Sequence, residues 1–184
     1  MSATNRGRQR ETNDFYPTPS WLTEALVPYL GTPLRILEPA AGEGAITTVL
    51  QRAFPHAIID AGDITTGQDF LTYPWQAGYY DLIITNPPYS LAEGFARRAL
   101  ELVAADGTVG ILSRVSFVAS QGRATWMRET HPSMYVTPGR PCFVRGKSDN
   151  CEYAWLLWNA TRSAIVWLKT ETINSSGDLF RRAG

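Results

Sequence analysis

The residues best suited to chemistry form the tetrapeptide Asn86-Pro87-Pro88-Tyr89, which follows the short apolar run of residues 82–84. Two successive prolines can neither donate ladder hydrogen bonds nor continue a helix, so the run is predicted to be a buried parallel strand that stops at Asn86. The residues after it form a stiff, extended loop that offers backbone carbonyls, an amide oxygen and a flat ring. Because open α/β sheets bind ligands beyond the carboxyl ends of their strands, this loop is suited to holding a planar amine.

A glycine turn at residues 39–44 is the second stretch that could bind a ligand. It lies between a strand predicted at residues 33–38 and a helix predicted at residues 45–53. Gly42 and Gly44 allow the backbone to approach a ligand that a Cβ would block. The turn lacks the third glycine of the dinucleotide fingerprint, and Glu38 at the end of the strand would repel a pyrophosphate. A positively charged amino group suits this carboxylate better.

A carboxylate also lies at the tip of the second predicted strand, residues 57–62, which is followed by Asp63 and Ile64. An acidic residue about 20 residues beyond a glycine turn accepts hydrogen bonds from ribose hydroxyls in nucleotide-binding sheets. Asp60, inside the strand, is the alternative carboxylate. This part of the chain therefore favours a ligand that carries a ribose.

Together these stretches resemble the S-adenosylmethionine-dependent amino-methyltransferases. The Asn-Pro-Pro-Tyr tetrapeptide resembles motif IV, which holds the amine of adenine or, less often, of cytosine or a protein glutamine. The glycine turn with Glu38 before it resembles motif I, and residues 15–19 resemble motif X, which packs against the methionine end of the cofactor. Asp63 aligns with motif II, which favours it over Asp60. Asp69 and its aromatic neighbour resemble the element that bonds the cofactor's adenine amine.

The resemblance implies one cofactor site and one catalytic site, and it implies no metal. The cofactor-binding residues that it implies for S-adenosylmethionine are Phe15, Tyr16, Pro17, Thr18, Glu38, Pro39, Ala40, Gly42, Gly44, Asp63, Ile64, Asp69, Phe70 and Asn86. The catalytic residues are Asn86, Pro87, Pro88 and Tyr89. In this scheme the Asn86 amide oxygen and the Pro87 carbonyl accept the two N–H groups of the amine and stabilise the charge that develops during attack on the methyl group. Tyr89 stacks on a base flipped out of the duplex.

The pattern as a whole is similar to the small, phage-type N6-adenine DNA methyltransferases. Three alternatives remain: an RNA adenine methyltransferase, a protein glutamine methyltransferase, and a catalytically silent methyltransferase-fold module that only binds nucleic acid. Glutamine methylation is expected less, because the sequence shows no N-terminal helical domain of the kind that binds such a substrate. No segment of about 80 residues remains for target recognition. Recognition could therefore need a homodimer or a partner subunit.

Charge is distributed unevenly although the formal net charge is zero. Residues 114–184 hold 10 of the 17 Lys and Arg residues but only 5 of the 17 Asp and Glu residues. A basic segment of this kind can neutralise several phosphates, so nucleic acid is the predicted partner, and the resemblance implies DNA. The predicted nucleic-acid-binding residues are Arg114, Arg123, Arg140, Arg145 and Lys147.

The length of 184 residues favours a single domain. We expect one methyltransferase catalytic domain at residues 14–171, between a flexible basic tail at 1–13 and a frayed tail at 172–184. The resemblance implies an α/β, Rossmann-like class I methyltransferase fold: a mostly parallel seven-stranded sheet with helices on both faces and an antiparallel C-terminal edge. No apolar run is long enough to span a membrane and the N-terminus is not a secretory signal, so a cytoplasmic location is expected, with Cys142 and Cys151 reduced.

The remaining elements are predicted from caps and periodicity. Ser20 should cap a helix at residues 21–30, and Ser90 should cap a second helix that ends at Asp106 and Gly107. Weak helical character is expected at residues 123–130. Further strands are predicted at residues 108–112 and 134–137, and residues 152–159 and 164–169 are predicted to pair with each other as an antiparallel edge.

Overall fold

The computed structural model describes residues 17–141, 143, 151–158 and 163–169. Both predicted tails, 1–13 and 172–184, lie outside these ranges, as does Cys142. Four predicted site residues also lie outside them: Phe15, Tyr16, Arg145 and Lys147.

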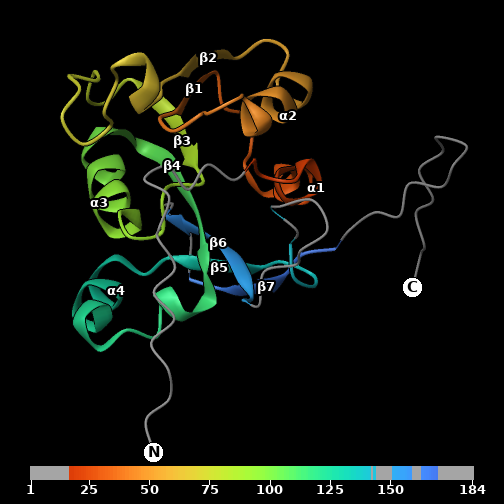
Figure 1. Cartoon of the computed structure of the whole chain (residues 1–184), viewed down its shortest axis with the longest axis vertical. Coiled ribbons are helices and arrows are strands. Elements are labelled where there is room, and N and C mark those ends of the chain that lie inside the picture. The colour runs from red at the N-terminus through yellow and green to blue at the C-terminus, as the bar shows by residue number, and fades with distance from the viewer. Residues whose placement is uncertain (1–16, 142, 144–150, 159–162, 170–184) are drawn as a thin grey trace, which may run out of the picture.

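Seven strands form one sheet in the order β2-β1-β3-β4-β6-β5-β7 (Figure 1). The first four strands in this order are parallel, β6 is antiparallel to both of its neighbours, and β7 is parallel to β5. The bounds of the strands are Arg35–Glu38 for β1, Ile58–Ala61 for β2, Tyr80–Thr85 for β3, Val103–Arg114 for β4, Ser133–Val136 for β5, Tyr153–Trp158 for β6 and Ile165–Trp167 for β7. The predicted seven-stranded, mostly parallel α/β fold is confirmed.

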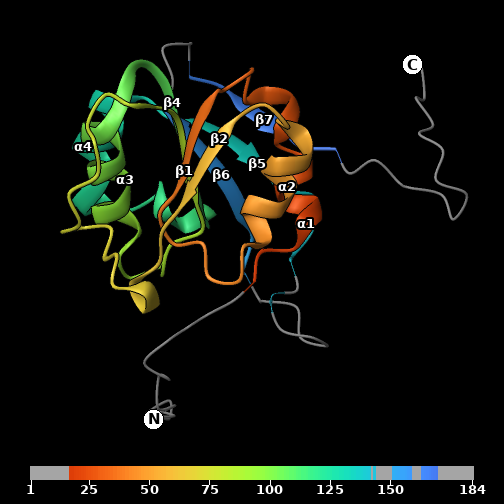
Figure 2. The ribbon, with the colours of Figure 1, turned by 90° about the horizontal axis from the view of Figure 1, so that it is seen from above.

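Helices cover both faces of the sheet, as Figure 2 shows from above. One face carries α1 and α2, and the other carries α3 and α4, so the core consists of two separate hydrophobic clusters. The α-helices within the described residues are α1 (Ser20–Glu24), α2 (Ala45–Ala53), α3 (Ala92–Leu102) and α4 (Ala124–Thr130). Short 3₁₀ turns lie at Val27–Tyr29, Ile64–Thr66, Val115–Phe117 and Gln121–Arg123.

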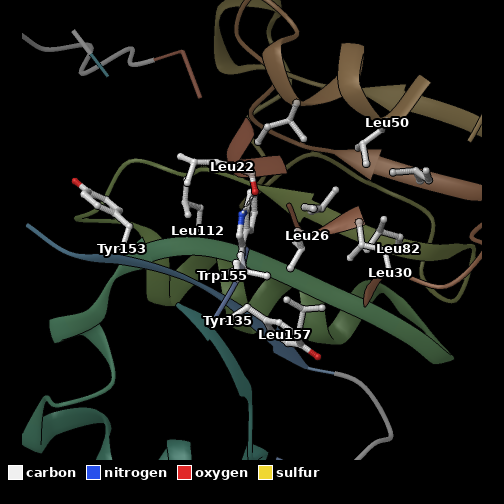
Figure 3. Close-up of a cluster of buried hydrophobic side chains, with 14 of the residues drawn as sticks. Leu22, Leu26, Leu30, Leu50, Leu82, Leu112, Tyr135, Tyr153, Trp155 and Leu157 are labelled. Carbon is white, nitrogen blue, oxygen red and sulfur yellow. Dashed lines mark hydrogen bonds between the residues drawn. The ribbon is translucent and has the colours of Figure 1, made fainter. Parts of the chain in front are cut away.

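The cluster beneath α1 fixes the segment that carries Pro17 and Thr18. Trp155 of β6 is fully buried, and its indole Nε1 donates a hydrogen bond of 2.9 Å to the carbonyl oxygen of Leu22 in α1. Figure 3 shows this indole pointing toward α1 among buried leucines. A buried indole N–H needs such a partner, and the surrounding apolar burial contributes on the order of 2 kcal/mol per large side chain. This contact anchors the start of the chain's described part to the middle of the sheet.

Several predicted boundaries were wrong. Ser20 and Ser90 do not cap helices: Pro19 and Leu91 occupy the N-cap positions, and neither helix has a side-chain cap. The first helix ends at Glu24, and a 3₁₀ turn that contains Pro28 follows it, because proline cannot donate the next helical hydrogen bond.

The second helix ends at Leu102, not at Asp106 and Gly107. The β-branched Val103 is already extended and pairs with Tyr80, and the register between β3 and β4 shifts before Thr108. The two C-terminal strands also do not pair with each other, since β5 lies between β6 and β7.

Candidate active site

One cavity of about 610 Å³ opens at the carboxyl ends of β1, β2 and β3. The predicted cofactor-binding and catalytic residues that line it are Pro17, Thr18, Glu38, Pro39, Ala40, Gly42, Asp63, Ile64, Asp69, Phe70, Asn86, Pro87, Pro88 and Tyr89. Gly44 is not among the lining residues. Residues far apart in the sequence thus meet at one site, as expected where parallel strands end at the same edge of a sheet.

The glycine turn owes its path to two backbone conformations that other residues rarely adopt. Gly42 has φ 52° and Gly44 has φ 79°, both in the left-handed region. Gly44 occupies the N-cap position of α2, and its own N–H donates to the carbonyl of Ala41. Gly44 therefore shapes the turn, whereas Gly42 borders the cavity directly.

Glu38 is a buried carboxyl group at the end of β1. Its side chain is 1 % exposed and accepts a hydrogen bond from the hydroxyl of Thr47, in the first turn of α2. Burial raises the pKa of Glu38 to about 8, since the Thr47 hydrogen bonds only partly offset the loss of hydration, and nearby Asp63 adds to the increase. No cationic side chain among the described residues pairs with Glu38, so its carboxyl group is largely protonated at neutral pH, and a cation placed beside it would favour its ionised form.

Asp63 organises the loop after β2. One carboxylate oxygen accepts the N–H of Gly42 at 2.9 Å, and the other accepts the N–H of Thr65 at 2.9 Å and the Thr65 hydroxyl at 2.7 Å. Burial alone would raise the pKa of Asp63, but these hydrogen bonds outweigh it and hold the pKa below its ordinary value. Asp60, in contrast, accepts the Tyr80 hydroxyl at 2.8 Å and does not line the cavity.

Asn86 has one occupied end and one end without a partner. Its Nδ2 donates a hydrogen bond of 3.0 Å to the Thr18 hydroxyl oxygen. Its Oδ1 is buried, and no donor among the described residues lies within hydrogen-bonding distance of it. A buried acceptor without a donor costs stability, so it is rarely retained without a function. This oxygen is suited to accepting an N–H group from a ligand.

Tyr89 lies at the cavity wall with its ring already supported. The guanidinium of Arg114 is 4.8 Å from the ring centroid, and the Tyr153 ring is 5.7 Å away. Arg114 also donates a long hydrogen bond of 3.5 Å to the Tyr153 hydroxyl. These contacts hold the Tyr89 ring in place from the end of β4 and the start of β6.

The three described arginines of the predicted nucleic-acid interface lie in different surroundings. Arg114 lies over the Tyr89 ring. Arg123 packs on Phe117, donates to its carbonyl and lies 3.6 Å from a Glu93 carboxylate oxygen. Arg140 forms a 2.7 Å ion pair with Glu152. None of the three lines the cavity, and of the three Arg114 contacts a residue that does, Tyr89.

Two residues important for the site were missed from the sequence. Thr47 supplies the hydroxyl that holds Glu38, and Thr65 supplies two donors to Asp63. The sequence indicated a role for Thr47 only through its position: it carries a hydroxyl between Ile46 and Val49, on the apolar face of the helix that follows the glycine turn.

Within the described ranges there is no group of three or more His, Cys, Asp or Glu residues that could hold a metal. Nor does any helix in them have the length and apolarity needed to cross a membrane.

No family model matches the sequence. Ribosomal protein uL3 glutamine methyltransferase from Bradyrhizobium diazoefficiens is 34 % identical over an alignment of 172 residues; the match covers 79 % of this chain and 49 % of the relative. The chain therefore spans about half the length of the curated relative that it matches.

Solved structures with the same fold include a predicted O-methyltransferase from Agrobacterium tumefaciens, at TM-score 0.59 and 16 % identity, covering 85 % of this chain and 90 % of that one. A modification subunit assigned to a type I restriction enzyme of Vibrio vulnificus gives TM-score 0.60 and 13 % identity, covering 93 % of this chain and 50 % of that one. Sheet, helices and these similarities agree: the chain has the Rossmann-like fold of the class I methyltransferases.

Proposed function

We propose that this chain transfers a methyl group from S-adenosylmethionine to a planar amine, and that its acceptor is the N6 amine of adenine in DNA. The observation that carries the proposal is the buried Asn86 Oδ1, which has no donor among the described residues and lies in the same cavity as Glu38. The Asn86 oxygen is suited to the amine that is methylated, and the Glu38 carboxyl group is suited to an amino group that only binds. A cofactor with a cationic amino group and an amine substrate would satisfy both.

The cavity fits the cofactor in size and in the chemistry of its walls. Its volume of about 610 Å³ lies within the range of small-molecule sites. Glu38 would bind the amino group of the methionine part, Asp63 the ribose hydroxyls and Asp69 the adenine amine. When bound, S-adenosylmethionine supplies the sulfonium methyl group that the amine attacks.

The chain's own part in the reaction is to orient the amine and to stabilise positive charge. The lone pair of an exocyclic or amide nitrogen is delocalised, so the nitrogen attacks only if a pyramidal geometry is favoured. In this proposal the Asn86 oxygen and the Pro87 carbonyl accept both N–H groups, and their attraction for these groups grows as positive charge develops on the nitrogen. Neither group needs to remove a proton before attack.

Adenine in DNA is favoured by the Asn-Pro-Pro-Tyr resemblance together with the supported ring of Tyr89. Flipping a base costs a few kcal/mol, and stacking on an aromatic ring offsets about 1–3 kcal/mol of this cost. Arg114 beside that ring adds positive charge where the backbone of a flipped nucleotide would pass.

A glutamine carboxamide is the second candidate, and the sequence similarity favours it. The relative from Bradyrhizobium diazoefficiens is named for methylating a glutamine of ribosomal protein uL3. A carboxamide nitrogen is planar and carries two N–H groups, so the same two acceptors would hold it.

A transfer assay with tritiated S-adenosylmethionine separates the candidates. The purified chain would be incubated in parallel with duplex DNA, single-stranded DNA, ribosomal RNA, release factor and ribosomal protein uL3, and the products digested and identified. N6-methyladenine from DNA is the expected product, and methylglutamine would establish the second candidate instead. Cofactor binding without label in any acceptor would contradict the proposed activity.

Replacing Tyr89 tests the stacking role. Tyr89→Ala should lower kcat/KM for the acceptor about tenfold or more, because it removes the stacking surface, whereas Tyr89→Phe should stay within about twofold of the wild type. Steady-state kinetics at saturating cofactor measures both. Tyr79→Ala is the matched control, since Tyr79 also carries an arginine on its ring, at 4.9 Å, but does not line the cavity. If Phe proves as damaging as Ala, the ring does not act by stacking.

A further inference from the structure

The side chain of Asn86 has two ends of similar shape and opposite chemistry. If the carboxamide were turned by 180°, two N–H donors would face the amine in place of the acceptor oxygen, and the substrate would be repelled. The correct orientation must therefore be held before the substrate arrives. Among the described residues, the contact that can do this is the 3.0 Å hydrogen bond from Nδ2 to the Thr18 hydroxyl oxygen.

We infer that Thr18 is a positioning residue that holds the Asn86 carboxamide with its oxygen toward the substrate amine. This inference rests on the proposed function and deepens it. Thr18 is 6 % exposed, so few water molecules can replace its hydroxyl as the partner of Nδ2. Without that hydroxyl the buried N–H group would have no acceptor, and nothing among the described residues would hold the carboxamide in this orientation.

The backbone around Thr18 is well suited to this task. Pro19 restricts the Thr18 backbone to extended conformations, and Pro17 before it has its own φ fixed by its ring. The N–H of Leu22 donates to the Pro19 carbonyl at 3.0 Å, and the Leu22 carbonyl accepts the Trp155 indole N–H. Thr18 is thus tied through α1 to the central part of the sheet, which also carries Asn86 at the end of β3.

The contact can be tested without any methyl transfer, from the side-chain amide signals of Asn86 in a ¹⁵N-labelled protein, assigned by their loss in Asn86→Ala. In the wild type one Nδ2 proton should exchange slowly, because it is bonded to Thr18. Thr18→Val should abolish this protection and Thr18→Ser should keep it. Thr23→Val is the matched control, since the Thr23 hydroxyl is buried in α1 and has no hydrogen-bond partner among the described residues. Unchanged Asn86 signals in Thr18→Val would overturn the inference.

Turnover gives the second readout. At saturating cofactor, Thr18→Val should lower kcat about tenfold, the effect of one lost hydrogen bond on the orientation of the amide. Thr18→Ser should restore most of this loss, and Thr23→Val should match the wild type. If raising the cofactor concentration restores the turnover of Thr18→Val, Thr18 acts only on cofactor binding and the inference is wrong. If the wild-type chain methylates no acceptor, the proposed function is contradicted. The amide signals would still show whether Thr18 holds the Asn86 side chain.

Discussion

Asn86→Ala should lower kcat about 100-fold or more while leaving the binding of S-adenosylhomocysteine nearly unchanged. The substitution removes one of two acceptors that stabilise the transition state, and losses of this size are typical when one preorganised hydrogen-bonding group is deleted. The free energy of unfolding should change by no more than about 1 kcal/mol, because the variant loses the bond to Thr18 but also removes a buried oxygen without a partner. Single-turnover kinetics, calorimetric titration and thermal unfolding give the three quantities.

Asn86→Asp is the informative companion variant. It keeps an acceptor oxygen at the same place, so it should retain more turnover than Asn86→Ala. Equal loss in both variants would mean that Asn86 does not act as an acceptor. A parallel loss of cofactor affinity in Asn86→Ala would assign the residue to cofactor binding in place of catalysis.

The corner at the end of β3 could be predicted from the sequence because its determinants are local. Proline fixes its own φ and restricts the residue before it, so the strand was predicted to stop at Asn86, and β3 ends one residue earlier, at Thr85. The glycine turn is equally local: Gly42 and Gly44 adopt the left-handed conformations that the turn requires. Such residues act through their own sterics and depend little on the rest of the fold.

The contacts that hold the site could not be predicted because they join distant parts of the chain. Thr18 and Asn86 are 68 positions apart, and Leu22 and Trp155 are 133 apart. Nothing in the sequence near Thr18 indicates that its hydroxyl will meet an amide at the end of a central strand. Such pairs follow from the order of the strands and from the packing of α1 on β6.

The basic half of the sequence shows that charge composition alone is a poor predictor of nucleic-acid contacts. Counting charges predicted five nucleic-acid contacts, yet the structure pairs Arg123 with Glu93, and Glu93 comes from the acidic half of the chain. Glu93 also pairs with Arg97 on α3. Exposed pairs of this kind contribute little to stability, but they reduce the charge that remains for a polyanion. Arg123 is therefore a weaker candidate for a phosphate contact than its place in the basic half of the sequence suggests.

Glu38 carries an ionisable group, unlike Asn86, so its contribution to the free energy of unfolding should depend strongly on pH. Burial holds the pKa of Glu38 at about 8 in the free protein, above the 4.5 of an exposed glutamate. A raised pKa favours the protonated folded state, so this contribution to stability is present in full below about pH 4.5 and is lost as the pH rises through about 8. Between pH 6 and 8.5 the free wild type should lose about 2–3 kcal/mol relative to Glu38→Gln, measured by denaturant unfolding at each pH.

Cofactor binding should also depend on the protonation state of the Glu38 carboxyl group. A cationic amino group beside Glu38 favours the carboxylate, so binding near pH 7 should release close to one proton, and affinity should rise up to about tenfold per pH unit between pH 6 and 7.5. Calorimetric titration of S-adenosylhomocysteine in buffers of different ionisation enthalpy counts the proton directly. Glu38→Gln should bind more weakly and release none, whereas Glu43→Gln, which removes an exposed carboxylate from the same cavity, should behave as the wild type. Proton release that persists in Glu38→Gln would show that another group titrates, and the carboxylate at the end of β1 would then not be the partner of the amino group.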